Sequence, residues 1–196
     1  MKTIEVLLID TNKININDIL FSSFISESER KEFEKYQHIE TRNEKIVSRY
    51  LKNKYIGEYY IGESGKPLSK DKHFNISHSH GVVVMVIDEV NVGVDVEIIK
   101  DYSEELKNYI SSFEEKLYIK DRISFFEVWT NKEALLKAVG TGLRNKINEI
   151  PSLPINGKRV YQGVEYLNKT LVYNELIITV SRESVEEFEI KLNEDI

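Results

Sequence analysis

The sequence predicts an α+β fold built from two similar subdomains, and three observations indicate it. Segments with the two-residue apolar period of strands are interspersed with segments that have the period of helices. Each half of the chain supplies helices and about three strands, and a short polar dip at 88–91 separates the halves. We therefore expect an N-terminal α+β subdomain over residues 1–90 and a C-terminal one over residues 91–196, with the functional site at their junction.

Helix-start signals organise the first half. Ser26-x-x-Glu29 and Thr41-x-x-Glu44 have the capping-box pattern, in which two side chains satisfy the first free amides of a helix. The expected elements are a strand at 3–10, helices at 27–37 and 41–56, and strands at 58–63 and 81–88.

The second half is expected to begin with a strand and a long helix. Ser124-x-x-Glu127 resembles another capping box, and Gly140 suits the left-handed residue that ends a helix. Runs of β-branched and aromatic residues further on predict strands joined by tight turns. The expected elements are a strand at 92–99, helices at 103–110, 113–121 and 124–139, and strands within 159–166 and 171–180.

The composition excludes several classes of protein. A chain of 196 residues can bury a core, and without cysteine it has no disulfide framework, thiolate zinc site or thiol nucleophile. Its formal net charge of -6 argues against general nucleic-acid binding. Residues 1–10 are too short an apolar stretch for a signal peptide or a membrane span. We expect a monomeric, cytoplasmic protein with no nucleic-acid or membrane partner.

The segment Gly93-Val-Asp95-Val-Glu97 carries two candidate metal ligands. Valines alternate with the acids, so a strand turns its valines into a core and both carboxylates to the other face. An isolated Asp-x-Glu is usually the solvated face of a strand. A third carboxylate would complete the oxygen ligands that a hard cation such as magnesium prefers, and Glu133 is the natural third.

The segment Trp129-Thr-Asn-Lys132-Glu133-Ala-Leu-Leu-Lys137 is predicted to be helical. Trp129, Glu133 and Lys137 follow i, i+4, i+8 spacing and line one edge of the helix, with Lys132 one residue aside. Glu133 and Lys137 could form an ordinary ion pair. The apolar residues around them nevertheless predict a buried helix, whose charges need a partner or a ligand. Phosphate oxygens suit both lysines.

Three weaker signals lie upstream. In Phe74-Asn-Ile-Ser77-His78-Ser-His80 the two histidines could hold a transition metal, but a phosphate contact from His78 and Ser77 fits the other motifs better. Gly65-Lys66-Pro67 is a turn by its chemistry. A basic stripe on the helix at 41–56 is either a solvated face or an anion contact. The stripe consists of Arg42, Lys45, Arg49 and Lys52.

Taken in order, these segments resemble the 4'-phosphopantetheinyl transferases of the surfactin-synthetase-activating type. The similar stretch runs from Gly65 to Leu143 and includes Gly140-Thr-Gly142-Leu143 after the long helix. The resemblance implies a pseudo-twofold pair of α+β subdomains that bind coenzyme A as co-substrate, with Mg²⁺, or Mn²⁺ as an alternative, in the cleft between them.

The resemblance also implies roles for individual residues. Metal ligands would be Asp95, Glu97 and Glu133. Phosphate contacts would come from Ser77, His78, Lys132 and Lys137, with the adenine nucleotide beside Lys66 and Pro67 and its 3'-phosphate on Arg42. Glu114 matches another acidic position of the family. The helix near 27–37 departs from the family pattern, although Lys31 and Lys35 lie close to the lysines that hold the 3'-phosphate in relatives.

The implied reaction transfers the 4'-phosphopantetheine arm of coenzyme A to a serine of an apo acyl, peptidyl or polyketide carrier protein. Adenosine 3',5'-bisphosphate is released. Glu133, Glu114 or a metal-held water would take the serine proton, and Lys137 would balance charge on the leaving phosphate. The alternatives are a metal-dependent phosphohydrolase and a non-catalytic coenzyme A-binding module.

Overall fold

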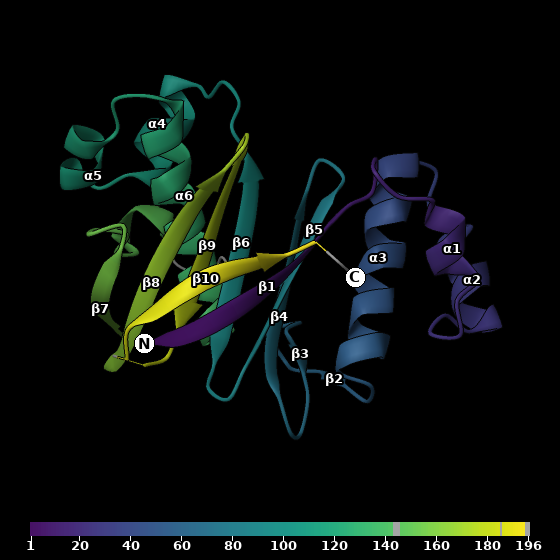
Figure 1. The fold of residues 1–196 in the computed structure, drawn as a ribbon. Coiled ribbons are helices and arrows are strands. Elements are labelled where there is room, and N and C mark those ends of the chain that lie inside the picture. Colours follow the sequence, from purple (N-terminus) through teal and green to yellow (C-terminus); the bar gives the residue numbers. More distant parts are fainter. Residues whose placement is uncertain (143–145, 185, 195–196) are drawn as a thin grey trace.

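The computed structural model describes residues 1–142, 146–184 and 186–194, which form four layers. Two four-stranded sheets pack face to face, and helices cover the outer face of each sheet (Figure 1). Three apolar cores fill the spaces between successive layers. The predicted α+β class is confirmed. Within the described residues, no helix is long and apolar enough to cross a membrane.

The first sheet has the strand order β10-β1-β5-β4. Its helices pack on the outer face through apolar residues such as Phe33, Leu51 and Met85. A small separate hairpin, β2-β3, carries the Gly65-Lys66-Pro67 turn. The elements of this part are β1 (Lys2–Asp10), α1 (Ile16–Leu20), α2 (Glu27–Phe33), α3 (Ile39–Tyr55), β2 (Tyr60–Ile61), β3 (Pro67–Leu68), β4 (His73–Ser79), β5 (Val82–Asp88) and β10 (Phe188–Asn193).

The second sheet has the strand order β6-β9-β8-β7, with each neighbouring pair antiparallel. Its outer face packs against α6 and the short helices beside it. The elements are β6 (Val92–Ile98), α4 (Glu104–Ile110), α5 (Phe113–Tyr118), α6 (Arg122–Val139), the 3-10 turn η1 (Ile147–Glu149), β7 (Gly157–Tyr161), β8 (Val164–Tyr173) and β9 (Leu176–Arg182).

The helix ends follow the capping chemistry, and two predicted starts are wrong. Ser26 forms the expected capping box with Glu29, and Gly140 ends α6 in the left-handed region with φ 82°. The long helix begins two residues before the predicted start, because the Asp121 side chain accepts the amide of Ser124, which thus lies inside the helix. Helix α3 begins at Ile39 without a side-chain cap.

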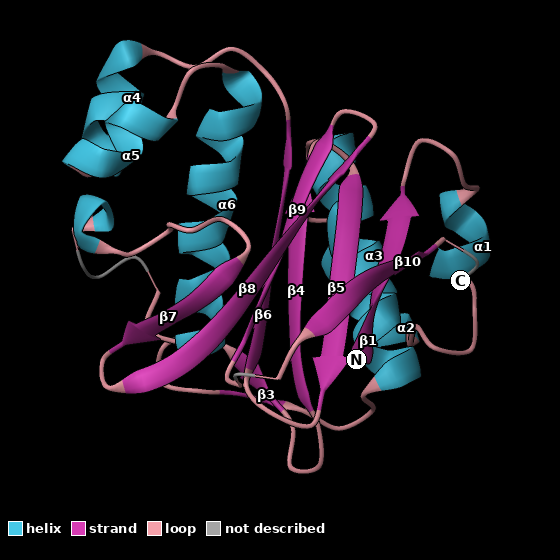
Figure 2. Cartoon of the chain, turned by 60° about the vertical axis from the view of Figure 1, so that its left-hand side comes forward, coloured by secondary structure: helices cyan, strands magenta, loops and turns pink. Residues whose placement is uncertain are grey.

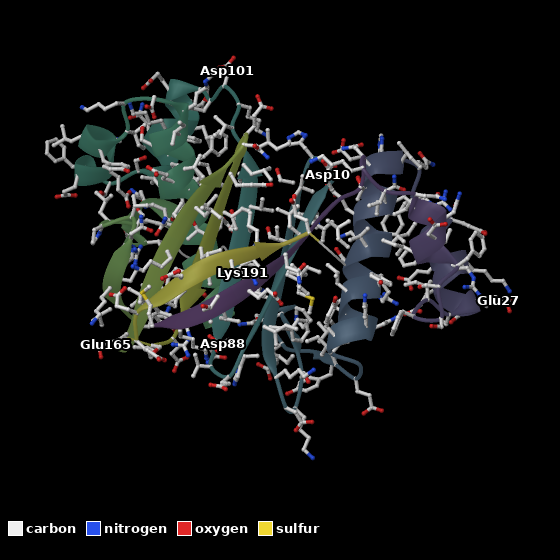
Figure 3. The ribbon with its side chains drawn as sticks, in the orientation of Figure 1. Asp10, Glu27, Asp88, Asp101, Glu165 and Lys191 are labelled. Atoms are coloured by element: carbon white, nitrogen blue, oxygen red, sulfur yellow. The ribbon has the colours of Figure 1, made fainter. Side chains whose placement is uncertain are left out.

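The last strand departs from the predicted division of the chain at residue 90. β10 leaves the second half and pairs in parallel with β1, from Lys2 opposite Phe188 to Leu7 opposite Asn193. Figure 2 shows it beside β1 in the first sheet. A buried ion cluster near this crossing joins both sheets, because Asp88 of β5, labelled in Figure 3, pairs with Arg182 of β9 and with Lys2.

The two sheets meet at strands β4 and β6, which lie at the edges of their sheets and run beside one another. The buried amide of Val94 in β6 donates to the Asn75 side chain of β4, at 3.0 Å, instead of to a neighbouring backbone. A buried amide needs such a partner, so the side chain of Asn75 replaces a ladder bond. This junction positions the candidate site.

Gly93 allows α6 to pack directly on β6. A Cβ atom at this position would overlap the carbonyl oxygen of Ala134 and the amide nitrogen of Ala138, both in the helix backbone. Backbone atoms cannot rotate away as a flexible side chain can. The helix therefore lies as close to the strand as a glycine permits, and its side chains reach past the strand toward β4.

We expect Gly93→Ala to destabilise the protein by at least about 3 kcal/mol, the upper part of the range for overpacked cores, because the helix must shift away from the strand. Gly163→Ala is the control: its φ of 79° strains alanine, but no atom lies close to the added Cβ, so it should cost about 1–2 kcal/mol. Urea unfolding measures both. Equal losses for the two variants would contradict the close approach at Gly93.

Candidate active site

Asp95 lies at the centre of the site, on the face of β6 that meets α6. Its side chain is buried, and its Oδ1 accepts from Ser77 Oγ at 2.9 Å and from Lys137 Nζ at 2.6 Å. Lys137 also donates to Ser77 Oγ at 2.7 Å. The other oxygen, Oδ2, is buried without a partner. Strand β4, strand β6 and helix α6 each supply one member of this triad.

Glu133 lies one helical turn before Lys137 and faces the same cluster. Its Oε1 is also buried without a partner. Burial, with the nearby charges of Asp95 and Glu97, raises the pKa of Glu133 to about 7, although Lys137 acts in the opposite direction. A carboxylate with such a pKa can exchange a proton near neutral pH.

Glu97 differs from the other two acids because both of its oxygens have partners. Ser79 Oγ donates to Oε2 at 2.7 Å, and Trp129 Nε1 donates to Oε1 at 3.2 Å. Burial raises the pKa of Glu97, and the charge of Asp95 adds to this. The predicted alternation on β6 thus holds, but the acids face the helix and not open solvent.

The donor chemistry of the cluster fits a hard divalent cation. Asp95 and Glu133 each present a buried oxygen without a partner, and such groups are costly unless a ligand satisfies them. In the described part of the chain, no three His, Asp or Glu side chains already converge on one point suited to a metal. The cation nearest to Asp95 in this structure is the ammonium of Lys137.

A cavity of about 220 Å³ lies between the Gly65-Lys66-Pro67 turn and the end of α6. Asn75, Glu133 and Lys137 also line it, so it opens onto the carboxylate cluster. Lys66 Nζ donates to the carbonyl of Ala138 at 2.9 Å, and burial lowers the pKa of Lys66 to about 8. A larger cavity of about 440 Å³ between β1 and α1 contains none of the predicted site residues.

His78 and Arg42 lie at the α3 side of β4. His78 Nδ1 is 3.0 Å from Glu44 Oε2, and burial lowers the pKa of His78. Glu44 is itself buried and also accepts the amide of Gly81 at 2.8 Å. Arg42 is half-buried on α3, with an Nε that has no partner. His78 lies near the site, since the charges of Lys137 and Asp95 act on it.

The residues of the basic stripe on α3 have different partners. Arg49 pairs with Glu29 at 2.8 Å, so part of its charge is already neutralised. Lys52 lies over the ring of Tyr59, and burial lowers the pKa of Lys52 to about 8. On α2, Lys31 is exposed and pairs with Glu27 at 2.9 Å. Arg42 differs from Arg49 and Lys52 because it has a buried donor, Nε, without a protein partner.

The prediction that Lys132 contacts phosphate is wrong. Its ammonium is fully buried on the far side of α6, where it pairs with Glu115 at 2.7 Å and donates to the carbonyls of Ile147 and Ile150. Successive helical residues point about 100° apart, so Lys132 and Glu133 cannot both face β6. Lys132 instead anchors the segment after α6 to α5.

Two further expectations concern the same region. Glu114 is exposed on α5 and accepts from Ser112, whereas the next residue, Glu115, is the buried partner of Lys132. Leu143, the end of the Gly140-Thr-Gly-Leu motif, lies outside the described residues. Sequence reasoning missed Asn75, Ser79 and Glu44, although the period of two along β4 relates Asn75 and Ser79 to Ser77.

We expect Glu133→Gln to stabilise the metal-free protein at pH 8 by about 1–3 kcal/mol. The raised pKa of Glu133 means that the folded state holds its proton more tightly than the unfolded state. Stability therefore falls as pH rises from about 4.5 to about 7, and glutamine removes that loss. The gain should vanish near pH 4.

Urea unfolding at several pH values measures this effect. Glu165→Gln, at an exposed position on β8 labelled in Figure 3, is the control and should leave stability unchanged throughout. A Glu133→Gln variant that is less stable than the parent at pH 8 would show that the carboxylate is not strained by its surroundings.

Comparison of the sequence with known proteins identifies its family. Residues 91–180 match the profile of the 4'-phosphopantetheinyl transferase superfamily. The chain is 30% identical over 164 residues to the 4'-phosphopantetheinyl transferase gsp of Aneurinibacillus migulanus, an alignment that covers 74% of this chain and 69% of that protein. It is 32% identical over 142 residues to the 4'-phosphopantetheinyl transferase Sfp of Bacillus subtilis (strain 168), covering 63% of each. The chain belongs to the 4'-phosphopantetheinyl transferase superfamily, a family of enzymes.

Proposed function

We propose that this protein transfers the 4'-phosphopantetheine arm of coenzyme A to a serine of an apo carrier protein. The observation that carries the proposal is the hydrogen-bonded triad of Ser77, Asp95 and Lys137. Its member Lys137 lines, together with Glu133 and Lys66, the cavity described above. The cavity brings Lys66 from the first half of the chain together with Glu133 and Lys137 from the second, and its volume of about 220 Å³ suits part of a nucleotide ligand.

The proposed chemistry is a displacement at phosphorus. The serine oxygen bonds to the phosphorus that carries pantetheine, the bond from that phosphorus to the bridging oxygen breaks, and adenosine 3',5'-bisphosphate leaves. Glu133, which lines the cavity, takes the serine proton as general base. Lys137 moves from Asp95 to the pyrophosphate and stabilises the charge on the leaving phosphate.

The divalent ion belongs to the proposal. Asp95 and Glu133, with Glu97 beside them, would hold Mg²⁺ or Mn²⁺ through their oxygens. When bound, the ion supplies positive charge that polarises and neutralises the pyrophosphate. Ser77 contributes a hydroxyl to the same region. His78 is proposed as a further phosphate contact, because its Nε2 remains available while Nδ1 faces Glu44.

The nucleotide end is proposed to lie toward the first sheet. Lys66 and Pro67 line the cavity and would border the adenine nucleotide. Arg42, whose Nε has no partner, would bind the 3'-phosphate through charge-assisted hydrogen bonds. A monomeric state and a cytoplasmic location stay predictions.

Intact-mass spectrometry of apo acyl and apo peptidyl carrier proteins, incubated with the protein, coenzyme A and Mg²⁺, tests the function. We expect a gain of one phosphopantetheine mass, and a loss of about a hundredfold or more in rate for Asp95→Asn. Asp101→Asn is the control, because Asp101 is exposed beyond the end of β6 (Figure 3). Breakdown of coenzyme A without a carrier would indicate a phosphohydrolase, and binding without turnover a non-catalytic module.

Lys137→Met should separate the two duties of this lysine. The variant removes the Lys137 ammonium, which is the present counter-ion of Asp95. In the absence of coenzyme A, Mg²⁺ should therefore bind roughly tenfold more tightly to the variant than to the parent. Transfer should become slower chiefly through kcat, because the lost charge acts on the leaving phosphate. Isothermal titration and steady-state kinetics measure these effects.

The control for Lys137→Met is Lys191→Met, at an exposed position on β10 labelled in Figure 3. It removes the same charge far from the cluster and should change neither measurement. Weaker Mg²⁺ binding by Lys137→Met would contradict the competition between the ammonium and the divalent ion for Asp95.

A further inference from the structure

Two side chains outside the predicted site hold the carboxylate of Glu97. Ser79 Oγ donates to one oxygen at 2.7 Å, and the indole nitrogen of Trp129 donates to the other at 3.2 Å. By contrast, Asp95 and Glu133 each keep one buried oxygen without a partner. Glu97 is therefore the member of the carboxylate cluster whose orientation the protein fixes by donors on both oxygens.

The two donors come from different elements, since Ser79 lies on β4 and Trp129 lies on α6. Ser79 lies on β4, two residues after Ser77, so the two hydroxyls share a face of that strand and bond to Glu97 and Asp95 respectively. Trp129 lies on α6, one helical turn before Glu133. The hydrogen bonds to Glu97 therefore come from an element of each half of the molecule. The donor residues lie close in sequence to the residues that contact or accompany Asp95, namely Ser77 and Glu133.

A carboxylate that accepts these two hydrogen bonds can still bind a cation. Each carboxylate oxygen has two lone pairs, so an oxygen that accepts one hydrogen bond can still coordinate a metal ion. Donors behind a metal ligand restrict its rotation, and their loss typically weakens metal binding by about 10- to 100-fold. Ser79 is buried, so water does not readily replace its hydroxyl.

We propose that Ser79 and Trp129 are positioning residues that hold Glu97 as the fixed carboxylate of the cation site. Asp95 and Glu133 then adjust around Glu97 when the divalent ion replaces the Lys137 ammonium. This inference rests on the proposed function, since it takes Glu97 as a carboxylate that faces the ion. It adds two residues that act through Glu97, to which both donate a hydrogen bond.

The chain contains a natural probe for this arrangement. Trp129 is its single tryptophan, and its indole N–H bonds directly to Glu97. Binding of a divalent ion to Glu97 withdraws electron density from the oxygen that accepts this bond. Tryptophan fluorescence of the intact protein should therefore change on addition of Mg²⁺ in the presence of coenzyme A, with the same midpoint as calorimetric binding.

The decisive experiment titrates Mg²⁺ into Ser79→Ala, Ser79→Thr and Trp129→Phe by calorimetry, with coenzyme A present. Ser79→Ala and Trp129→Phe should each bind Mg²⁺ about 10- to 100-fold more weakly than the parent. Ser79→Thr, which keeps the hydroxyl, should recover most of the affinity. In Ser79→Ala the fluorescence midpoint should move to higher Mg²⁺ together with the calorimetric one.

Tyr118→Phe is the matched control for loss of a donor to a carboxylate. Tyr118 donates to Glu127 on α6, at an exposed position away from the carboxylate cluster, so its loss should leave Mg²⁺ binding unchanged. A purely structural role for Ser79 and Trp129 would lower the unfolding midpoint without weakening Mg²⁺ binding by the folded variants.

The outcomes separate this inference from the proposed function. If the parent modifies a carrier and Ser79→Ala and Trp129→Phe bind Mg²⁺ as tightly as the parent, the inference is overturned and the function stands. The inference is also overturned if the Trp129 fluorescence of the unsubstituted protein does not change on addition of Mg²⁺ while calorimetry detects Mg²⁺ binding. If the parent neither binds Mg²⁺ with coenzyme A nor modifies a carrier, both are overturned.

Discussion

The direct contact between the backbone of α6 and strand β6 at Gly93 is the constraint on which the site depends. Because no side chain separates helix from strand there, Glu133 and Lys137 reach the same space as Asp95. The rotation of the helix is fixed from its other side, where the buried Lys132 pairs with Glu115. Breaking such a buried pair by removing one partner typically costs about 3–5 kcal/mol, so the helix cannot easily turn.

The close approach of α6 to β6 brings carboxylates together whose negative charge the protein's own cations only partly neutralise. Three carboxylates lie near one another, burial raises the pKa of Glu133 and Glu97, and two buried oxygens have no partner. Lys137 compensates only part of this charge through Asp95. Buried groups that are left unsatisfied while the surrounding core is well packed are typical of binding sites, where a ligand completes what the protein leaves open.

Local periodicity was enough to predict much of this arrangement, and contacts distant in sequence account for what it missed. Alternation along β6 placed Asp95 and Glu97 on one face, and helical spacing placed Glu133 with Lys137. The same pattern led to a wrong prediction for Lys132, because its partner Glu115 lies on another helix, which local spacing does not reveal. The pairing of β10 with β1 joins residues far apart in the chain, which no local pattern encodes. Asp121 and Ser124 are both good capping residues, and only the structure shows which one caps α6.

The site also forms part of the join between the two sheets. Edge strands usually need protection because their backbone groups are unpaired. Here β4 protects β6 with side chains: Asn75 bonds the backbone, and Ser77 and Ser79 bond the carboxylates of Asp95 and Glu97. The residues that bind a cation would then be the residues that hold the halves together. A ligand that binds only the folded state stabilises it by mass action, so a cation bound at this site would also stabilise the folded junction between the sheets.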